Sequence, residues 1–107
     1  MKKTAQICLL SLLTFFMAGL SASAEDGEKL YIYKFCTTCH GQKGISHAPN
    51  YPNLAKQNER YLVNQVKDII AKKRSKKLTL LMTEHPVVIS ISDEEISAVA
   101  ANLTSIK

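Results

Sequence analysis

The sequence has few cysteines, and their positions exclude a disulfide framework. Of its 107 residues, only Cys8, Cys36 and Cys39 are cysteine. Cys8 lies in an apolar N-terminal segment, and a bond between Cys36 and Cys39 would close too small a loop to stabilise much. The sequence also has no internal repeats and no low-complexity tract. These absences indicate one small domain that needs another source of stability.

Charged residues are missing from positions 4–24, and this absence marks the first segment of the chain. Lys2 and Lys3 precede an apolar run over 7–20, and Ala22-Ser23-Ala24 places small residues at both recognition positions of a cleavage site. This pattern predicts a secretory signal peptide over residues 1–24, cleaved after Ala24, and export to the periplasm. An uncleaved membrane anchor is the alternative, because the uncharged stretch is about long enough to cross a bilayer.

Cleavage would leave a single domain of 83 residues, 25–107, with 12 basic and 9 acidic side chains. A core of this size is marginal by itself, so we expect the chain to fold poorly without a cofactor or another staple. Basic residues gather in 72–77 and acidic residues in 93–95. The basic run is either a solvated helix end or a docking patch for an acidic partner. Export separates the chain from nucleic acid, which we exclude as a partner.

The motif Cys36-Thr37-Thr38-Cys39-His40 carries the most chemistry. C-x-x-C-H is the attachment sequence of a c-type haem. Two thiols on one turn of backbone can each add to a haem vinyl group, and the next side chain can ligate the iron. The motif therefore predicts one covalent haem c, bound through Cys36 and Cys39, with His40 as an axial ligand.

Two other chemistries share part of this motif. A thioredoxin-like redox pair would need a βαβ pattern around C-x-x-C, and the segment before Cys36 instead has helical character. A zinc site would need a second pair of ligands, but the remaining histidines, His47 and His85, are far apart in the sequence. Haem attachment is the interpretation that the surrounding sequence favours.

Apolar periodicity and capping residues predict three helices. The first covers about 27–35, and the second covers about 58–73 with Asn58 as its N-cap. The last begins at a capping box formed by Ser92 and Glu95 and carries an apolar stripe. Residues 78–91 are apolar, β-branched and broken by Pro86, and we expect an extended loop there, with a short strand as the alternative.

The whole predicted domain resembles a class I cytochrome c of the small, single-haem, bacterial periplasmic type. The segments that carry the resemblance are 27–31 before the motif, 52–57, Tyr61-Leu62, Gln65, Leu81-Met82 and 92–96. It implies an all-α fold of three to four helices wrapped around one haem, with the first and last helices crossing near Gly27. It also implies that the Pro52 carbonyl accepts a hydrogen bond from His40. Asn102 stands where the family usually has an aromatic residue, so we expect a weaker helix contact there.

Met82 is the predicted sixth ligand, and its family position supports this assignment. It is the only methionine beyond the signal peptide, and it lies well after the motif. His85 is the main competitor. His47 follows His40 so closely that it would have to cross to the opposite haem face, so we interpret it as an exposed loop residue.

A His40/Met82 pair would fill both axial positions and would leave no site for a small-molecule substrate. The resemblance then implies a monomeric, soluble electron carrier rather than an enzyme. Its donor would be a quinol-oxidising complex or a dehydrogenase, and its acceptor a terminal oxidase or reductase. Two alternatives remain: a haem enzyme with a labile or His-ligated sixth position, and a haem subunit dedicated to one larger redox enzyme.

Overall fold

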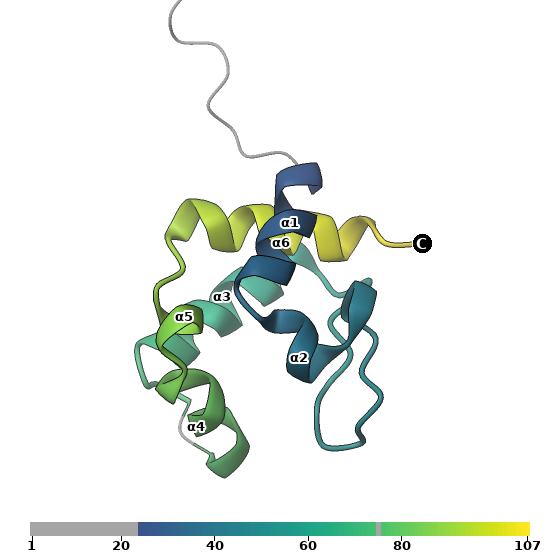
Figure 1. Cartoon of the computed structure of the whole chain (residues 1–107). Helices are drawn as coiled ribbons and strands as arrows, with labels where there is room; N and C mark the ends of the chain where they lie inside the picture. The colour runs from purple at the N-terminus through teal and green to yellow at the C-terminus, as the bar shows by residue number, and fades with distance from the viewer. Residues whose placement is uncertain (1–23, 75) are drawn as a thin grey trace, which may run out of the picture.

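The computed structural model describes residues 24–74 and 76–107, and it is all-helical over these residues (Figure 1). The elements in chain order are α1 (Ala24–Tyr33), α2 (Cys36–His40), the 3₁₀ turn η1 (Gln42–Gly44), α3 (Glu59–Ile70), α4 (Lys77–Glu84), α5 (Pro86–Ile89) and α6 (Asp93–Ser105). The described residues contain no strand, which confirms the all-α prediction. The predicted signal peptide lies, up to residue 23, outside the described residues.

Helices α1 and α6 cross in close contact at Gly27, as predicted (Figure 1). A Cβ atom added to Gly27 would overlap the carbonyl oxygen of Ala98 and would lie 2.9 Å from the Asn102 Cβ atom. Glycine is therefore required here, because only a residue without a side chain lets the two backbones approach so closely. Asn102 lies beside this contact.

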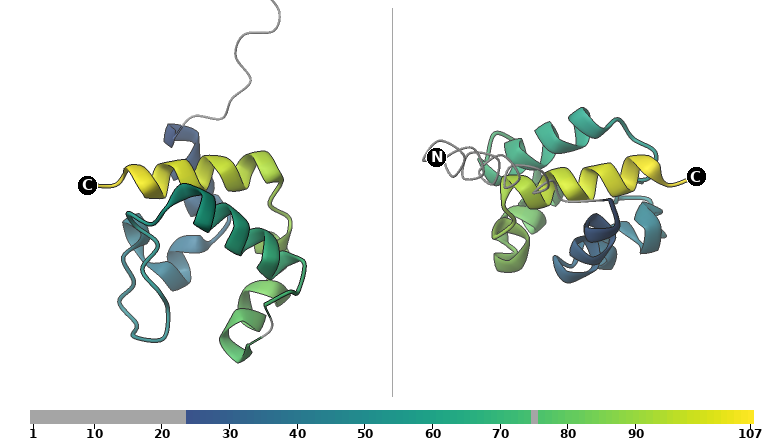
Figure 2. Two further views of the ribbon diagram at one scale, coloured as in Figure 1. Left: turned by 180° about the vertical axis from the view of Figure 1, so that it is seen from behind. Right: turned by 90° about the horizontal axis from the view of Figure 1, so that it is seen from above.

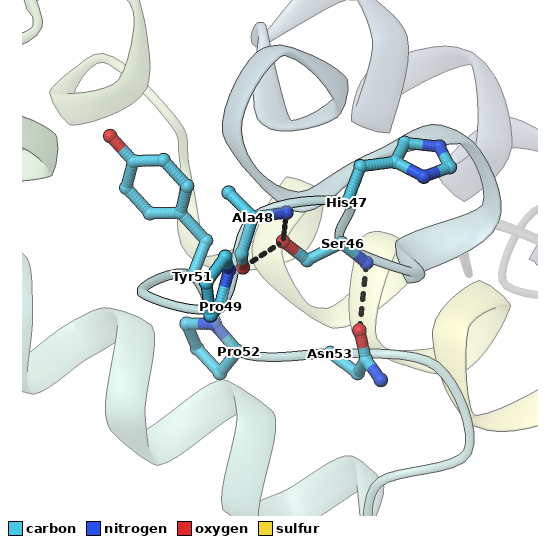
Figure 3. Close-up of a pocket in the computed structure, with 7 residues that line it drawn as sticks. All are labelled: Ser46, His47, Ala48, Pro49, Tyr51, Pro52 and Asn53. Atoms are coloured by element: carbon cyan, nitrogen blue, oxygen red, sulfur yellow. Dashed lines mark hydrogen bonds between the residues drawn. The ribbon is translucent and has the colours of Figure 1, made fainter.

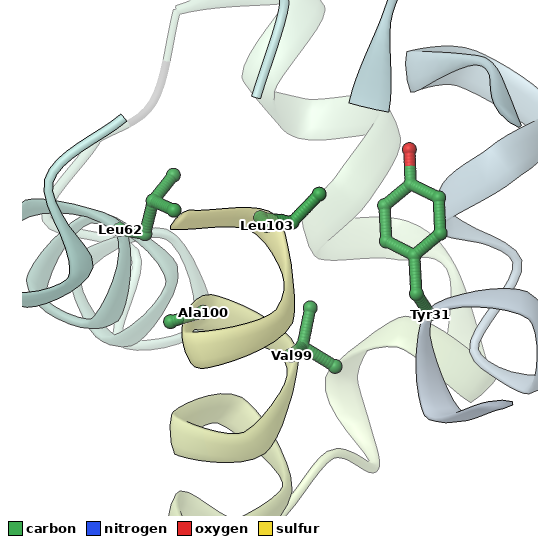
Figure 4. Packing of buried hydrophobic residues seen from close by; sticks show 5 residues of the cluster. All are labelled: Tyr31, Leu62, Val99, Ala100 and Leu103. Carbon is green, nitrogen blue, oxygen red and sulfur yellow. The ribbon is translucent and has the colours of Figure 1, made fainter. Parts of the chain in front are cut away.

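The buried core gathers around α6 (Figure 4). One face of that helix turns Val99, Ala100 and Leu103 toward Leu62 of α3 and Tyr31 of α1. These α6 positions belong to the predicted apolar stripe, whose spacing places them on one side of the helix. The core therefore joins α1, α3 and α6 without any residue from α4 or α5.

Capping residues fix where the helices begin, and two of the predicted caps are confirmed. The Asn58 side chain accepts a hydrogen bond from the Tyr61 N–H (3.0 Å) at the start of α3. At α6, the Ser92 hydroxyl accepts from the Glu95 N–H, and the Glu95 carboxylate accepts from the Ser92 N–H. Each interaction satisfies a backbone donor that has no partner within its helix.

The predicted helix ends were too late. Helix α1 stops at Tyr33, because Phe35 takes a left-handed backbone conformation (φ +61°) that turns the chain into α2. Helix α3 stops at Ile70, and Lys72 (φ +59°) turns the chain away from its axis. Apolar spacing does not reveal these turns, because neither residue is a glycine.

The prediction of an extended loop over 78–91 was wrong. Two helices, α4 and α5, occupy most of this segment. Pro86 is the first residue of α5, where a missing N–H costs nothing, so it separates two helices instead of preventing them. The buried Thr83 hydroxyl is within hydrogen-bond distance of the Thr79 (3.2 Å) and Ile69 (3.4 Å) carbonyl oxygens, which ties α4 to α3.

A long loop joins η1 to α3, and both ends of it are anchored. The Gly44 carbonyl accepts hydrogen bonds from the N–H groups of Leu54 (2.8 Å) and Ala55 (3.1 Å), and the Lys56 N–H donates to Leu103 of α6 (2.9 Å). Figure 2 shows that this loop and the α4–α5 pair extend from the α6 side of the molecule in the same general direction. Two arms thus stand opposite each other below the crossing of the terminal helices.

None of the described helices combines the length and the apolar character needed to cross a bilayer.

Candidate functional site

A cavity of about 620 Å³ lies between the two arms. Its lining is mainly apolar and comes from the end of α1, from α2, the long loop, α3, α4, α5 and α6. The residues predicted to bind haem all belong to this lining: Cys36, Cys39, His40, Pro52 and Met82. A cavity of this size and character is within the ordinary range for cofactor sites.

Cys36 and Cys39 lie one helical turn apart on α2, and both are half-buried free thiols facing the cavity. Burial raises the pKa of the Cys36 thiol to about 11. A redox-active C-x-x-C pair needs the opposite shift, because the thiolate is the nucleophile. The environment of Cys36 therefore fits a cysteine that is attached to a cofactor better than one that exchanges disulfides.

His40 is buried, and a hydrogen bond to a backbone carbonyl orients its ring. Its Nδ1 lies 3.0 Å from the carbonyl oxygen of Pro52, and a carbonyl can only accept, so Nδ1 carries the proton. The neutral ring therefore has its lone pair on Nε2. A histidine oriented in this way, with one nitrogen donating to a backbone carbonyl, is the usual arrangement for a metal ligand.

Two contacts shape the backbone around His40. Gly41 has a φ of +78°, and a Cβ there would overlap the Ile45 carbonyl oxygen, so the chain can leave α2 only through glycine. The buried Tyr31 hydroxyl donates to the Gly41 carbonyl (2.6 Å). Burial raises the pKa of Tyr31 above its usual range, so the hydroxyl stays protonated. The hydrogen bond between Tyr31 and Gly41 could not be predicted from the sequence, because ten residues separate the partners and no local pattern marks the pair.

Met82 and His85 both line the cavity from the arm opposite α2. Met82 is half-buried and lies within helix α4, not in the predicted loop. His85 ends α4 and begins α5, and its Nδ1 accepts a hydrogen bond from the Val88 N–H (3.4 Å). Its ring lies against Phe35, with 5.6 Å between ring centroids. His85 thus links the Met82 helix to the turn that precedes the cysteines.

His47 is exposed and does not line this cavity. It lies in a shallow pocket of the long loop formed by residues 46–49 and 51–53 (Figure 3). The loop there is folded by its own hydrogen bonds, from the Ser46 N–H to the Asn53 side chain (2.7 Å) and between Ser46 and Ala48. The structure thus separates His47 from the other candidate residues.

A family model described as cytochrome c matches residues 24–107. The chain belongs to the cytochrome c family. Cytochrome c4 of Pseudomonas aeruginosa is 39% identical over 97 residues, which cover 90% of this chain and 46% of the relative. Cytochrome c-554(548) of Halomonas halodenitrificans is 39% identical over 88 residues, which cover 82% of this chain and 98% of the relative. The chain thus spans about half the length of the cytochrome c4 relative and nearly all of the smaller one.

One further relative and one solved structure are also similar to this chain. The thiosulfate dehydrogenase electron acceptor of Stutzerimonas stutzeri is 32% identical over 95 residues, which cover 81% of this chain and 42% of that protein. A solved cytochrome c4 structure from Acidithiobacillus ferrooxidans has a TM-score of 0.63 at 24% identity, covering 84% of this chain and 53% of that chain. This structural likeness shows that the fold is that of cytochrome c.

The residues of the cavity fit the haem c of this family. The two thiols and His40 all come from the short helix α2, and all three line a mainly apolar space. The free Nε2 lone pair of His40 is the correct donor for iron. The cytochrome c domain therefore carries a covalent haem c on its Cys36–Cys39–His40 motif.

Proposed function

We propose that this cytochrome c is a periplasmic electron carrier whose axial ligands are His40 and Met82. The observation that carries the proposal is the arrangement of four side chains on one apolar cavity: Cys36, Cys39 and His40 from α2, and Met82 from the opposite arm. Bound haem c supplies one-electron exchange between Fe(II) and Fe(III). The chain itself attaches the group, offers one ligand from α2 and one from α4, and keeps the lining mainly apolar.

Met82 is a better candidate for the second ligand than His85. The Nδ1 atom of His85 accepts from the Val88 N–H at the start of α5, and its ring packs on Phe35. Iron binding through either ring nitrogen would cost this cap, because Nδ1 would be ligated itself or, with Nε2 ligated in the neutral ring, would carry the proton. Among the described residues the Met82 thioether makes no hydrogen bond, and only its backbone carbonyl is engaged, accepting from the His85 N–H (3.2 Å). Its flexible thioether is therefore available to the cavity.

This ligand pair predicts how the carrier behaves. A soft, neutral thioether favours ferrous iron, and an apolar surrounding disfavours the extra charge of ferric iron. Both effects raise the reduction potential relative to bis-histidine ligation. His40 and Met82 would fill both axial positions, so the proposal includes no small-molecule substrate at the iron.

The proposed donors are a quinol-oxidising complex or a dehydrogenase, and the proposed acceptors are a terminal oxidase or reductase. The name of the Stutzerimonas stutzeri relative, an electron acceptor of thiosulfate dehydrogenase, supports a dehydrogenase as donor. Residues 1–24 would act as the signal peptide, and residues 25–107 would form the exported, monomeric carrier.

Substitution of the ligand tests this proposal. In the holo-protein, Met82→Ala should remove the second ligand, allow carbon monoxide to bind the ferrous form and lower the reduction potential. His85→Ala should leave carbon monoxide excluded and is the matched control, since it also removes a side chain that lines the cavity. Carbon monoxide binding to His85→Ala but not to Met82→Ala would assign the ligand to His85 instead.

A further inference from the structure

The charged side chains that line the haem cavity are all cationic. Over the described residues the lining includes no aspartate and no glutamate. Its cations are Lys34, Arg74, Lys76 and Lys77. Lys34 already has partners at the α1–α6 side, since its Nζ lies 3.7 Å from the Glu95 carboxylate and donates to the Ser90 hydroxyl (3.2 Å). The other three cations come from the segment 74–77, which follows α3 and ends at the first residue of α4.

Arg74 is the cation of this segment that the fold holds in place. After α3 ends, the left-handed Lys72 turns the chain back, and the Lys73 N–H donates to the Asp68 carbonyl (2.8 Å). Arg74 then donates from Nη1 to the side-chain oxygen of Gln65 on α3 (2.6 Å). Both Arg74 and Gln65 line the cavity, so the guanidinium is oriented at its edge.

The donors that remain match a carboxylate. A guanidinium has five N–H donors in a planar fork, and the bond to Gln65 uses only one of its groups. Such a fork binds carboxylates through two parallel hydrogen bonds, and these charge-assisted bonds are stronger than neutral ones. Lys76 and Lys77 add positive charge beside it. Among the described lining residues, the cations available to a ligand that carries carboxylates are therefore Lys34 and the three of this segment.

Haem c carries two propionate carboxylates. We propose that Arg74, oriented by Gln65 and supported by the charges of Lys76 and Lys77, binds a haem propionate. The proposal rests on haem c lying in this cavity, but it does not depend on Met82 as the sixth ligand. It also gives the basic run 72–77 a third role, besides a solvated helix end and a docking patch for an acidic partner.

The proposal predicts how the reduction potential depends on pH. A neighbouring cation lowers the pKa of a carboxylate, and the potential of a haem falls with rising pH over the range in which its propionate loses a proton. The charged or titratable groups around the cavity are the three cations of the segment, Lys34, the tyrosines and the two histidines His40 and His85. Arg74 is held at the edge of the cavity by its hydrogen bond to Gln65 of α3.

The experiment measures the potential against pH for the holo-protein and three variants. Arg74→Gln should move the falling part of the curve to higher pH by about one unit, and Arg74→Lys should keep most of the wild-type position. Lys73→Gln is the matched control, because it removes the same charge one residue away but Lys73 does not line the cavity. It should leave the position of the curve almost unchanged.

An Arg74→Gln curve that coincides with the Lys73→Gln curve would overturn the proposal. If Arg74→Gln leaves the curve in place and instead weakens association with an acidic redox partner, Arg74 belongs to a docking surface and the proposal is also wrong. The sulfur-to-iron absorption band of the oxidised protein, recorded on the same samples, reports the Met82 ligand separately. A missing band in the wild type would refute the proposed function without affecting the test of Arg74.

Discussion

The two sides of this small domain are built in different ways. Around α6, the polypeptide completes its own packing, with Tyr31 and Leu103 only 3% and 2% exposed and Gly27 pressed against Ala98. Along the cavity, large apolar side chains remain about half exposed, including Phe35 at 50% and Leu81 at 51%. Haem c would cover these side chains, so the cofactor completes the second side of the core.

This difference explains how a chain of this size can fold stably. An apolar core in a domain of 80 or so residues supplies only a few kcal/mol, and a cofactor that binds only the folded state adds its binding energy to stability. The terminal helices would then form the part that resists unfolding by itself, and the two arms would depend on haem. Substitutions around α6 and substitutions along the cavity should therefore have different effects on stability.

The largest effect is expected on the cavity side. The double variant Cys36→Ser and Cys39→Ser would remove covalent attachment, so we expect loss of bound haem and of cooperative thermal unfolding. Haem content after gel filtration and circular dichroism during heating would measure both. A variant that unfolds as cooperatively as the holo-protein would show that the polypeptide completes its core alone. Haem would then not be needed to complete the cavity side.

On the α6 side, Gly27→Ala should be strongly destabilising. The added methyl group would overlap the Ala98 carbonyl oxygen, and separating the two helices should cost about 3 kcal/mol of unfolding free energy. Denaturant titration of the holo-protein measures this loss. Ser97→Ala, an exposed change on the same helix, is the control and should stay within about 0.5 kcal/mol of the wild type. Equal stability of the two variants would contradict the close crossing.

A smaller effect is expected at His85, which joins α4 to α5 and contacts Phe35. His85→Ala should lower the unfolding free energy by about 1 kcal/mol, because it removes the cap of α5 and the contact with Phe35. His85→Asn keeps a side chain that can accept from the Val88 N–H, so it should recover part of the loss. Chemical denaturation of both variants measures the difference. A larger loss in the asparagine variant than in the alanine variant would argue against the cap.

The smallest effect concerns acid stability at the start of α6. The Ser92 N–H, and to a lesser degree Lys34, hold the pKa of Glu95 below its ordinary value near 4.5. The ionised carboxylate therefore stabilises the fold at neutral pH, and this contribution is lost as the pH falls below about 4.5 through the folded-state pKa. Glu95→Gln should remove that pH dependence and about 0.5 kcal/mol at pH 7. Unfolding curves at several pH values test this prediction. A Glu95→Gln variant that loses as much unfolding free energy in acid as the wild type would contradict it.

The sequence predicted one side of the molecule better than the other. The caps at Asn58 and Ser92 and the contact at Gly27 follow from short-range chemistry or a family pattern, and the structure confirms them. The segment 78–91 was predicted incorrectly, because β-branched residues and Pro86 indicate non-helical structure locally. The hydrogen bond from Thr83 to the Ile69 carbonyl of α3 is a long-range contact that local propensity does not reveal. The His85 cap of α5 is local, but histidine is not among the residue types preferred at an N-cap.

In the haem site too, local features could be predicted from the sequence and contacts between distant residues could not. The C-x-x-C-H motif is a local pattern and could be interpreted directly, whereas the Tyr31–Gly41 and Arg74–Gln65 hydrogen bonds join residues ten and nine positions apart. Side chains that meet only after the chain turns leave no periodic signal. The basic run could be seen in the sequence, but the direction of Arg74 could not, because it depends on the turn at Lys72.

The most direct test is the absorption spectrum of the oxidised, purified holo-protein in the near infrared. Ligation of covalent haem c by His40 and Met82 predicts a weak sulfur-to-iron band in the wild type, and the band should disappear in Met82→Ala. A wild-type spectrum without that band, or a band that survives in Met82→Ala, would contradict the proposal that the imidazole of His40 and the thioether of Met82 are the two axial ligands.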